Sequence, residues 1–323
     1  MRVSTPAFPF GQLDGPRPRQ PYNKSEPPGS MITSKGVTEL PTNGPSDAQA
    51  NKDISRKNEL FWNELCGTQF ARSLGVTDSS PASLKRFDDW YFMFYPYLPV
   101  HIPFDEMRGK RVLEVGLGYG TVSQRIAESG ANYSGLDIAE GPVAMVNNRL
   151  DQAGLGGTAV QGSILRAPFP DGYFDLVIAI GCLHHTGNLQ MALDECRRLL
   201  APGGRLVLMV YYAYSYRRLF QAPRETLVYA RREMLGYRGV VGQSASVERA
   251  AYDTNETGDA APHTDWISIR SLRKMCRDFS AFSAKLENID NGRPFERFPS
   301  RRELLKRWYP RWFGLDLYAT ATK

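Results

Sequence analysis

The sequence predicts an α/β fold built on a doubly wound, mainly parallel sheet. Three observations indicate this class. From residue 111 onward, short apolar runs alternate with helical segments, as in repeated βαβ units. A glycine-rich turn follows the first apolar run directly, and an aspartate ends the second. The 323 residues, 42% hydrophobic and 23% charged, suffice for an ordinary core and exclude collagen, coiled-coil and wholly disordered chains.

The expected elements follow from this alternation. The first five strands are expected at residues 111–115 (RVLEV), 132–136, 157–161, 174–180 (FDLVIAI) and 205–212, with helices near 120–129, 141–153 and 188–200 between them. APGG after the third helix predicts a helix stop and a turn into the next strand. Residues 213–262 interrupt the rhythm as an insertion; then come a helix near 267–278, a strand near 281–289, a basic helical piece near 299–308 and a last strand at 313–321.

The chain divides into three parts. Residues 1–52 are rich in Pro, Gly, Ser, Thr and Asn without apolar period, which predicts a disordered tail. Residues 53–105 place aromatic and aliphatic side chains three and four apart, as amphipathic helices do. Residues 106–323 hold the predicted sheet and the insertion.

Cysteine spacing and the apolar pattern set further expectations. Cys66, Cys182, Cys196 and Cys276 stand far apart, so neither a disulfide framework nor a metal site is expected. No signal peptide or membrane span is apparent, so we expect a cytoplasmic protein without a membrane partner, with a homo-oligomer left open.

The net charge of +6 is concentrated in two stretches. Residues 213–238 carry +4 and residues 293–311 carry +5, so nucleic acid is not the expected partner. A solvated helix face is the favoured interpretation. The alternative is an anionic acceptor or partner, to be tested by charge reversal at Arg217 and Arg218.

The glycine-rich turn carries the chemistry. In VLEVGLGYG a strand leads into Gly116, Gly118 and Gly120, where the backbone can turn sharply and approach a ligand closely. A purely structural turn would look similar. The dinucleotide fingerprint G-x-G-x-x-G would need glycine at Thr121, so the loop departs from it. Asp137, at the end of the second strand, is suited to accept hydrogen bonds from two ribose hydroxyls.

These motifs together resemble the class I S-adenosylmethionine (SAM)-dependent methyltransferases of the methyltransferase-11 type. The ordered series is VLEVGLGYG, GLDIA, QGSILRAPFPDGYFDLVIAIGCLHHT, LLAPGGRLVLMV and FGLDLYATATK, preceded by FWNELCG as in a bacterial subgroup. The resemblance implies a Rossmann-like sheet of seven strands, the last antiparallel and inserted between the fifth and sixth. It also implies a helical N-terminal lid, SAM as cofactor and S-adenosylhomocysteine as product.

The resemblance also implies site residues. Cofactor binding is expected from Glu114, Gly116, Gly118, Gly120, Asp137, Ile138, Ser163, Ile164, Gly181 and Cys182. Ser163 stands where most relatives carry an aspartate, which weakens the expected adenine contact. Lid residues Trp62, Arg86, Trp90 and Tyr91 are candidates to close on the cofactor, with helix packing as the alternative.

Methyl transfer needs alignment of the acceptor, with a base where the nucleophile is protonated. The candidate bases are His184, His185 and His263, with a structural role as the alternative for each. The expected function is methylation of a small molecule, at a hydroxyl of a natural product or sugar. A nicotinamide-dependent oxidoreductase and a non-catalytic SAM-binding regulator are the alternatives.

Overall fold

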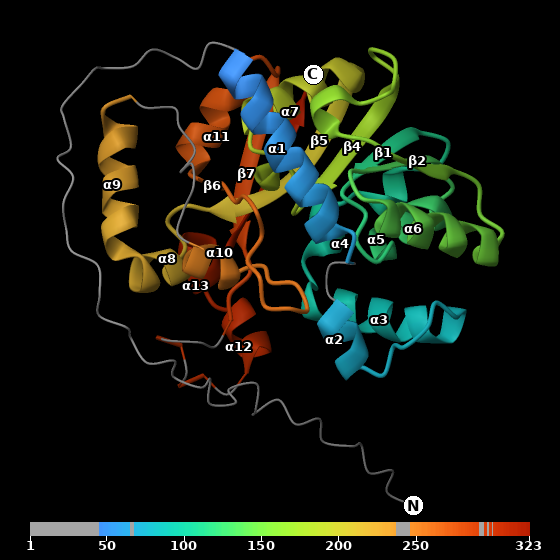
Figure 1. Cartoon of the computed structure of the whole chain (residues 1–323), viewed down its shortest axis with the longest axis horizontal. Helices are drawn as coiled ribbons and strands as arrows, with labels where there is room; N and C mark the ends of the chain where they lie inside the picture. Colours follow the sequence, from blue (N-terminus) through green and yellow to red (C-terminus); the bar gives the residue numbers. More distant parts are fainter. Residues whose placement is uncertain (1–44, 65–67, 237–245, 291–293, 296, 299) are drawn as a thin grey trace, which may run out of the picture. The chain divides into compact units, whose positions relative to one another are not determined.

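A mostly parallel sheet forms the centre of the computed structural model, which describes residues 45–64, 68–236, 246–290, 294–295, 297–298 and 300–323 (Figure 1). Its strands run in the order β3-β2-β1-β4-β5-β8-β7. They are β1 Arg111–Val115, β2 Asn132–Asp137, β3 Thr158–Gln161, β4 Phe174–Ile180, β5 Leu200–Tyr212, β7 Ala281–Glu287 and β8 Asp316–Thr322. β1 to β5 are parallel, whereas β8 is antiparallel to β5 and β7. The predicted doubly wound sheet with an inserted, antiparallel last strand is confirmed.

One strand was not expected. Trp266–Ile267 forms a two-residue β6 that pairs with the end of β5 outside the main path. Two residues carry no readable period, so the sequence pattern could not predict it.

Helices cover both faces of the sheet because strand side chains alternate between two apolar clusters. Leu113 and Val115 point into the cluster formed with α7 (Leu189–Leu199) and α11 (Ile269–Met275). Val112 points into the cluster formed with α4 (Leu98–His101), α5 (Thr121–Glu128) and α6 (Glu140–Ala153). The fold therefore has three layers.

The N-terminal segment is helical, as predicted, but its boundary differs. α1 spans Pro45–Trp62, followed by α2 (Thr68–Ser73) and α3 (Pro81–Phe94). α1 begins inside the predicted tail, because its first turns hold good helix formers such as Ala48 and Gln49 without apolar period. The described residues from 45 onward belong to one compact unit. The rest of the predicted tail, and residues 65–67 with Cys66, lie outside the described residues.

The insertion and the C-terminal region add short helices. They are α8 (Tyr216–Gln221), α9 (Pro223–Met234), α10 (Ser246–Ala250), α12 (Arg301–Leu305) and α13 (Tyr309–Phe313), beside the 3-10 turns η1 (Phe104–Glu106), η2 (Ile164–Arg166) and η3 (Leu183–His185). Among the described helices, none is long and apolar enough to cross a bilayer.

Two boundaries correct the sequence expectations. The APGG turn lies within β5, where the pairing register with β4 shifts between Phe174 and Leu176 and Gly203 takes a φ of 74°. The expected last strand from 313 begins only at Asp316, because Pro310 and its neighbours continue as α13 up to Phe313.

Candidate functional site

A cavity of about 480 Å³ opens at the carboxyl ends of β1, β2, β3, β4 and β5. It lies where the strand order reverses between β1 and β4, the position at which open α/β sheets bind ligands. The glycine loop, the ends of these strands, α1, α3 and residues 252–255 of the insertion line it.

The glycine loop gives the cavity one wall. Gly116, Gly118 and Gly120 all have positive φ, at 78°, 51° and 74°. A Cβ added to Gly116 would lie 2.5 Å from the Cβ of Cys182, so the loop can pass this close only with glycine. Gly116 and Gly118 line the cavity.

Gly120 differs from the other two. The Cβ it lacks would point at Arg149, 2.9 Å from Cδ, and Gly120 is not among the cavity-lining residues. It begins α5 and lets this helix pack closely against α6. The structure therefore places Gly120 in helix packing, and not against the cavity as expected.

Two buried carboxylates stand at the strand ends. Asp137 accepts the backbone N–H groups of Leu117 at 2.7 Å and Ala139 at 3.0 Å, which fixes the glycine loop to β2. Glu114 accepts from the hydroxyls of Ser123 at 2.5 Å and Tyr133 at 2.8 Å. Burial raises the pKa of Asp137, and raises that of Glu114 to about 7. Both line the cavity.

The ends of β2, β3 and β4 form another stretch of the cavity wall. Ile138, Ser163 and Ile164 line one part of it, and Gly181 and Cys182 another. Ser163 Oγ accepts the N–H of Leu165 at 3.2 Å, which leaves its own proton available for donation. Burial raises the pKa of the Cys182 thiol, which donates to the carbonyl of Val115, so this sulfur remains a thiol.

α1 and α3 cover the cavity. Asn58 of α1 donates from Nδ2 to the backbone oxygen of His185 at 2.6 Å, and its Oδ1 is buried with no partner among the described residues. Trp62 and Tyr91 line the cavity, as the lid prediction requires. Arg86 and Trp90 are not among the lining residues: Arg86 donates to Ser83, and the Trp90 ring lies 5.6 Å from that of Phe87.

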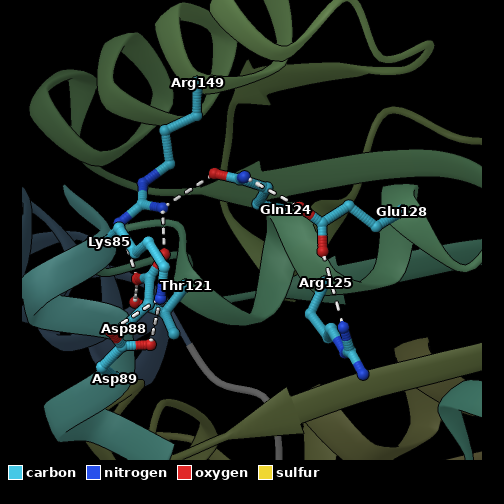
Figure 2. Close-up of polar contacts among 8 residues, drawn as sticks. All are labelled: Lys85, Asp88, Asp89, Thr121, Gln124, Arg125, Glu128 and Arg149. Atoms are coloured by element: carbon cyan, nitrogen blue, oxygen red, sulfur yellow. Dashed lines mark hydrogen bonds and ion pairs between the residues drawn. The ribbon is translucent and has the colours of Figure 1, made fainter. Parts of the chain in front are cut away.

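A buried ion pair joins α3 to α6 (Figure 2). Arg149 of α6 donates two hydrogen bonds of 2.9 Å to the carboxylate of Asp88 in α3, and a third to Gln124. Thr121, the residue that departs from the dinucleotide pattern, donates to the same carboxylate at 2.6 Å. The ring of Phe87 also stacks on Tyr119 at 4.3 Å. α3 is thereby attached to the start of α5.

Of the three candidate histidines, only His185 lines the cavity. Its Nδ1 lies 2.6 Å from the backbone oxygen of His263 and must donate to it, so Nε2 carries the free lone pair. Burial lowers the pKa of His185, which keeps the ring neutral. Nε2 lies 3.6 Å from Oδ2 of Asp253.

His184 and His263 do not reach the cavity. His184 is fully buried, and neither ring nitrogen has a partner among the described residues. Burial lowers its pKa well below the ordinary value. His263 is buried against Asp265, with Nε2 to Oδ1 at 2.8 Å. Neither side chain is therefore placed in the cavity, where the sequence offered both as candidate bases.

Asp253 is one residue that sequence reasoning missed. It lies in the polar half of the insertion, lines the cavity and accepts from the Tyr211 hydroxyl at 3.0 Å. Burial raises its pKa, although His185 opposes this shift. Asn58 was missed as well. Both depend on contacts across the fold that leave no local signal. Among the described residues, no group of three His, Cys, Asp or Glu could hold a metal ion.

Comparison with known proteins agrees with this location. Residues 113–208 match the family model of a methyltransferase domain, Methyltransf_11. A demethylmenaquinone methyltransferase of Tropheryma whipplei is 34% identical over 116 residues, 36% of this chain and 46% of that protein. A ubiquinone biosynthesis O-methyltransferase of Pseudomonas aeruginosa is 33% identical over 105 residues, 32% of this chain and 44% of that protein.

A fatty-acid O-methyltransferase of Mycolicibacterium smegmatis is 36% identical over 112 residues, 34% of this chain and 38% of that protein. The chain thus spans less than half the length of each of these relatives. Among solved structures, an S-adenosylmethionine-dependent methyltransferase from Mesorhizobium loti has a TM-score of 0.48 at 18% identity, covering 71% of this chain and 97% of that one.

Proposed function

We propose that this chain, whose residues 113–208 belong to the class I SAM-dependent methyltransferases, methylates a hydroxyl group of a small molecule. One observation carries the proposal. A single cavity is lined by the glycine loop and Asp137 and also by His185 and Asp253, whose Nε2 and Oδ2 lie 3.6 Å apart; we call the part beside these two residues the chamber. The first group suits the cofactor of this family, and the second suits removal of a proton.

The residues at the glycine-loop end fit SAM. Gly116 and Gly118 bring the loop backbone to the cavity surface. Each oxygen of Asp137 accepts one backbone N–H and retains a lone pair for a ribose hydroxyl. Glu114 would face the methionine end, where an ammonium group would favour its charged form. When bound, SAM supplies an electrophilic methyl group.

The residues at the other end would bind and deprotonate the acceptor. With Nδ1–H held by the His263 carbonyl, His185 can accept a hydroxyl proton only at Nε2. Asp253, whose Oδ2 lies 3.6 Å from the same nitrogen, would then stabilise the imidazolium by its negative charge. Trp62, whose ring lies 4.9 Å from that of His185, covers this chamber and would exclude water.

The chamber favours an acceptor with a ring. Tyr91, Tyr95, Tyr252 and Tyr318 line the cavity, as does Met209. Aromatic side chains pack well against planar or alicyclic bodies. Two relatives named above are O-methyltransferases by name. A natural product or sugar hydroxyl fits this lining.

The experiment has two parts. Calorimetry with SAM, S-adenosylhomocysteine and NAD should detect the first two ligands and not the third. Product mass spectrometry with ring-bearing phenols, quinols and sugars should then identify the acceptor. His185→Gln should lower kcat about 10²- to 10⁴-fold, with SAM affinity unchanged.

Tyr211→Phe is the matched control, since it removes only a hydroxyl that donates to Asp253. Its effect on kcat should be much smaller. NAD binding without SAM binding would refute the cofactor assignment. Full activity of His185→Gln would refute the assigned base.

A further inference from the structure

Helix α9 presents its apolar side chains to solvent and its polar side chains to the protein. Its buried residues are Thr226, Tyr229 and Glu233, whereas Leu227 is 61% exposed and Met234 71% exposed. Surface helices ordinarily bury the apolar side. In Figure 1, α9 stands at the edge of the fold with α8 at its foot.

Hydrogen bonds hold the polar side of α9 against the protein. Glu233 accepts from Ser271 Oγ and the Tyr214 hydroxyl, each at 2.6 Å, and also from Ser268 Oγ. Tyr229 accepts the N–H of Ser268 at 3.0 Å. Because these bonds satisfy the inner side, the outward apolar side chains belong to the folded state and are not a frayed end.

Cations lie on the same outward stripe. Arg224 and Arg231 are exposed and lie three or four residues from the exposed apolar positions, so they share one helix side with them. We call this stripe the basic apolar surface; it consists of Arg224, Leu227, Val228, Arg231, Met234 and Leu235. Glu225 is the one exposed acidic residue of α9.

Arg217 and Arg218 do not belong to this surface. Arg217 donates to Asp290, and Arg218, 2% exposed, donates to Glu248. Both charges are therefore paired with carboxylates of the same chain. Charge reversal there, the test suggested by the sequence, would break ion pairs instead of probing a partner.

A second segment adds the same chemistry. Trp308 is 54% exposed and Trp312 68% exposed, in the other basic stretch of the sequence. This segment packs on α8, because Tyr216 shares an apolar cluster with Leu304 and Tyr309. Exposed tryptophan beside arginine is typical of protein surfaces at a membrane interface.

We infer that the basic apolar surface docks this protein onto a bilayer that contains anionic lipids. Such a bilayer supplies anionic headgroups for the arginines and an acyl boundary for Leu227, Val228 and Met234. Nucleic acid would satisfy the charges but not these aliphatic side chains. A two-fold contact between copies would bring the same arginines together. On this proposal the protein binds a membrane surface, contrary to the expectation from sequence, without any described helix crossing the bilayer.

Vesicle flotation tests the inference on the full chain. Binding should be strong to phosphatidylcholine mixed with phosphatidylglycerol, weak to phosphatidylcholine alone, and reduced by added salt. Arg224→Gln and Arg231→Gln should each weaken binding about fivefold, and together about 30-fold. Val228→Glu should abolish it.

Val100→Glu and Arg125→Gln are the matched controls, because these exposed residues lie on α4 and α5. They should bind vesicles as the unaltered chain does. SAM affinity and thermal melting of all variants should be unchanged, so a failed docking test stays separate from a failed cofactor assignment.

Three outcomes would overturn the inference: equal binding to both vesicle types, unchanged binding by Val228→Glu, or no vesicle binding at low salt. Salt-sensitive binding to duplex DNA lost in the arginine variants would assign the surface to nucleic acid. A dimer dissociated by Val228→Glu in sedimentation velocity would assign it to a second copy.

Discussion

Removing Asp88 should destabilise the fold strongly, because it would leave a buried guanidinium without its carboxylate. The Arg149 side chain is 0% exposed and that of Asp88 20% exposed, and two hydrogen bonds of 2.9 Å join them. In Asp88→Ala, Gln124 remains as the hydrogen-bond acceptor of Arg149. Loss of one partner of a buried pair costs about 3–5 kcal/mol.

A double-mutant cycle isolates this cost from loss of packing. Arg149→Met replaces the cation by an apolar side chain that fills similar space, and Asp88→Ala/Arg149→Met removes both charges. The double variant should be more stable than Asp88→Ala alone, since no unpaired charge remains buried. Urea unfolding followed by circular dichroism gives the four free energies.

The coupling between the two sites should be about 2 kcal/mol or more. SAM affinity should also fall in Asp88→Ala, because α3 carries Tyr91 to the cavity. If the two single effects add within about 0.5 kcal/mol, the ion pair does not hold α3 and the reasoning fails.

Two further predictions concern the glycine loop and its carboxylate. Burial raises the pKa of Glu114 from 4.5 to about 7, so the folded chain retains a proton that the unfolded chain releases. The free energy of unfolding should therefore decrease by about 2.5 kcal/mol between pH 5 and pH 8, and Glu114→Gln should remove that decrease in urea titrations at these two pH values. An unchanged pH dependence would contradict the shift. Gly116→Ala should abolish SAM binding in calorimetry, whereas Gly109→Ala, with a similar φ of 70° but nothing within 4 Å, should cost only the left-handed strain of about 1–2 kcal/mol. If Gly116→Ala and Gly109→Ala had equal effects, the contact between Gly116 and Cys182 would not be tight.

The sequence predicted the sheet well because strands and glycine turns have local signatures. β1 and β4 have the predicted ends, and Asp137 lies at the glycine loop as its position after β2 suggested. The boundary of α1 could not be read, since a polar helix start has no apolar period. Gly120 fits the loop motif but serves the contact between α5 and α6. A sequence motif does not distinguish a glycine needed for helix packing from one that approaches a ligand.

The acceptor side was much less predictable. His184 and His185 are adjacent, yet one ring lies in the core and the other lines the cavity. Asp253 reaches His185 only because the insertion returns over the end of β5, where Tyr211 bonds it. Such placement depends on long-range packing, so neither the residue type nor its neighbours in the chain could indicate it.

The bond from Asn58 to the His185 backbone couples the covering helix to the turn that holds the proposed base. Glu64, just after α1, also accepts the N–H of Glu256 at 3.0 Å, and Arg72 pairs with Glu256 at 2.7 Å. If substrate entry requires α1 to undock, the fraction of molecules with α1 docked would scale both apparent affinity and turnover, and the rate of opening would limit turnover independently of the chemical step.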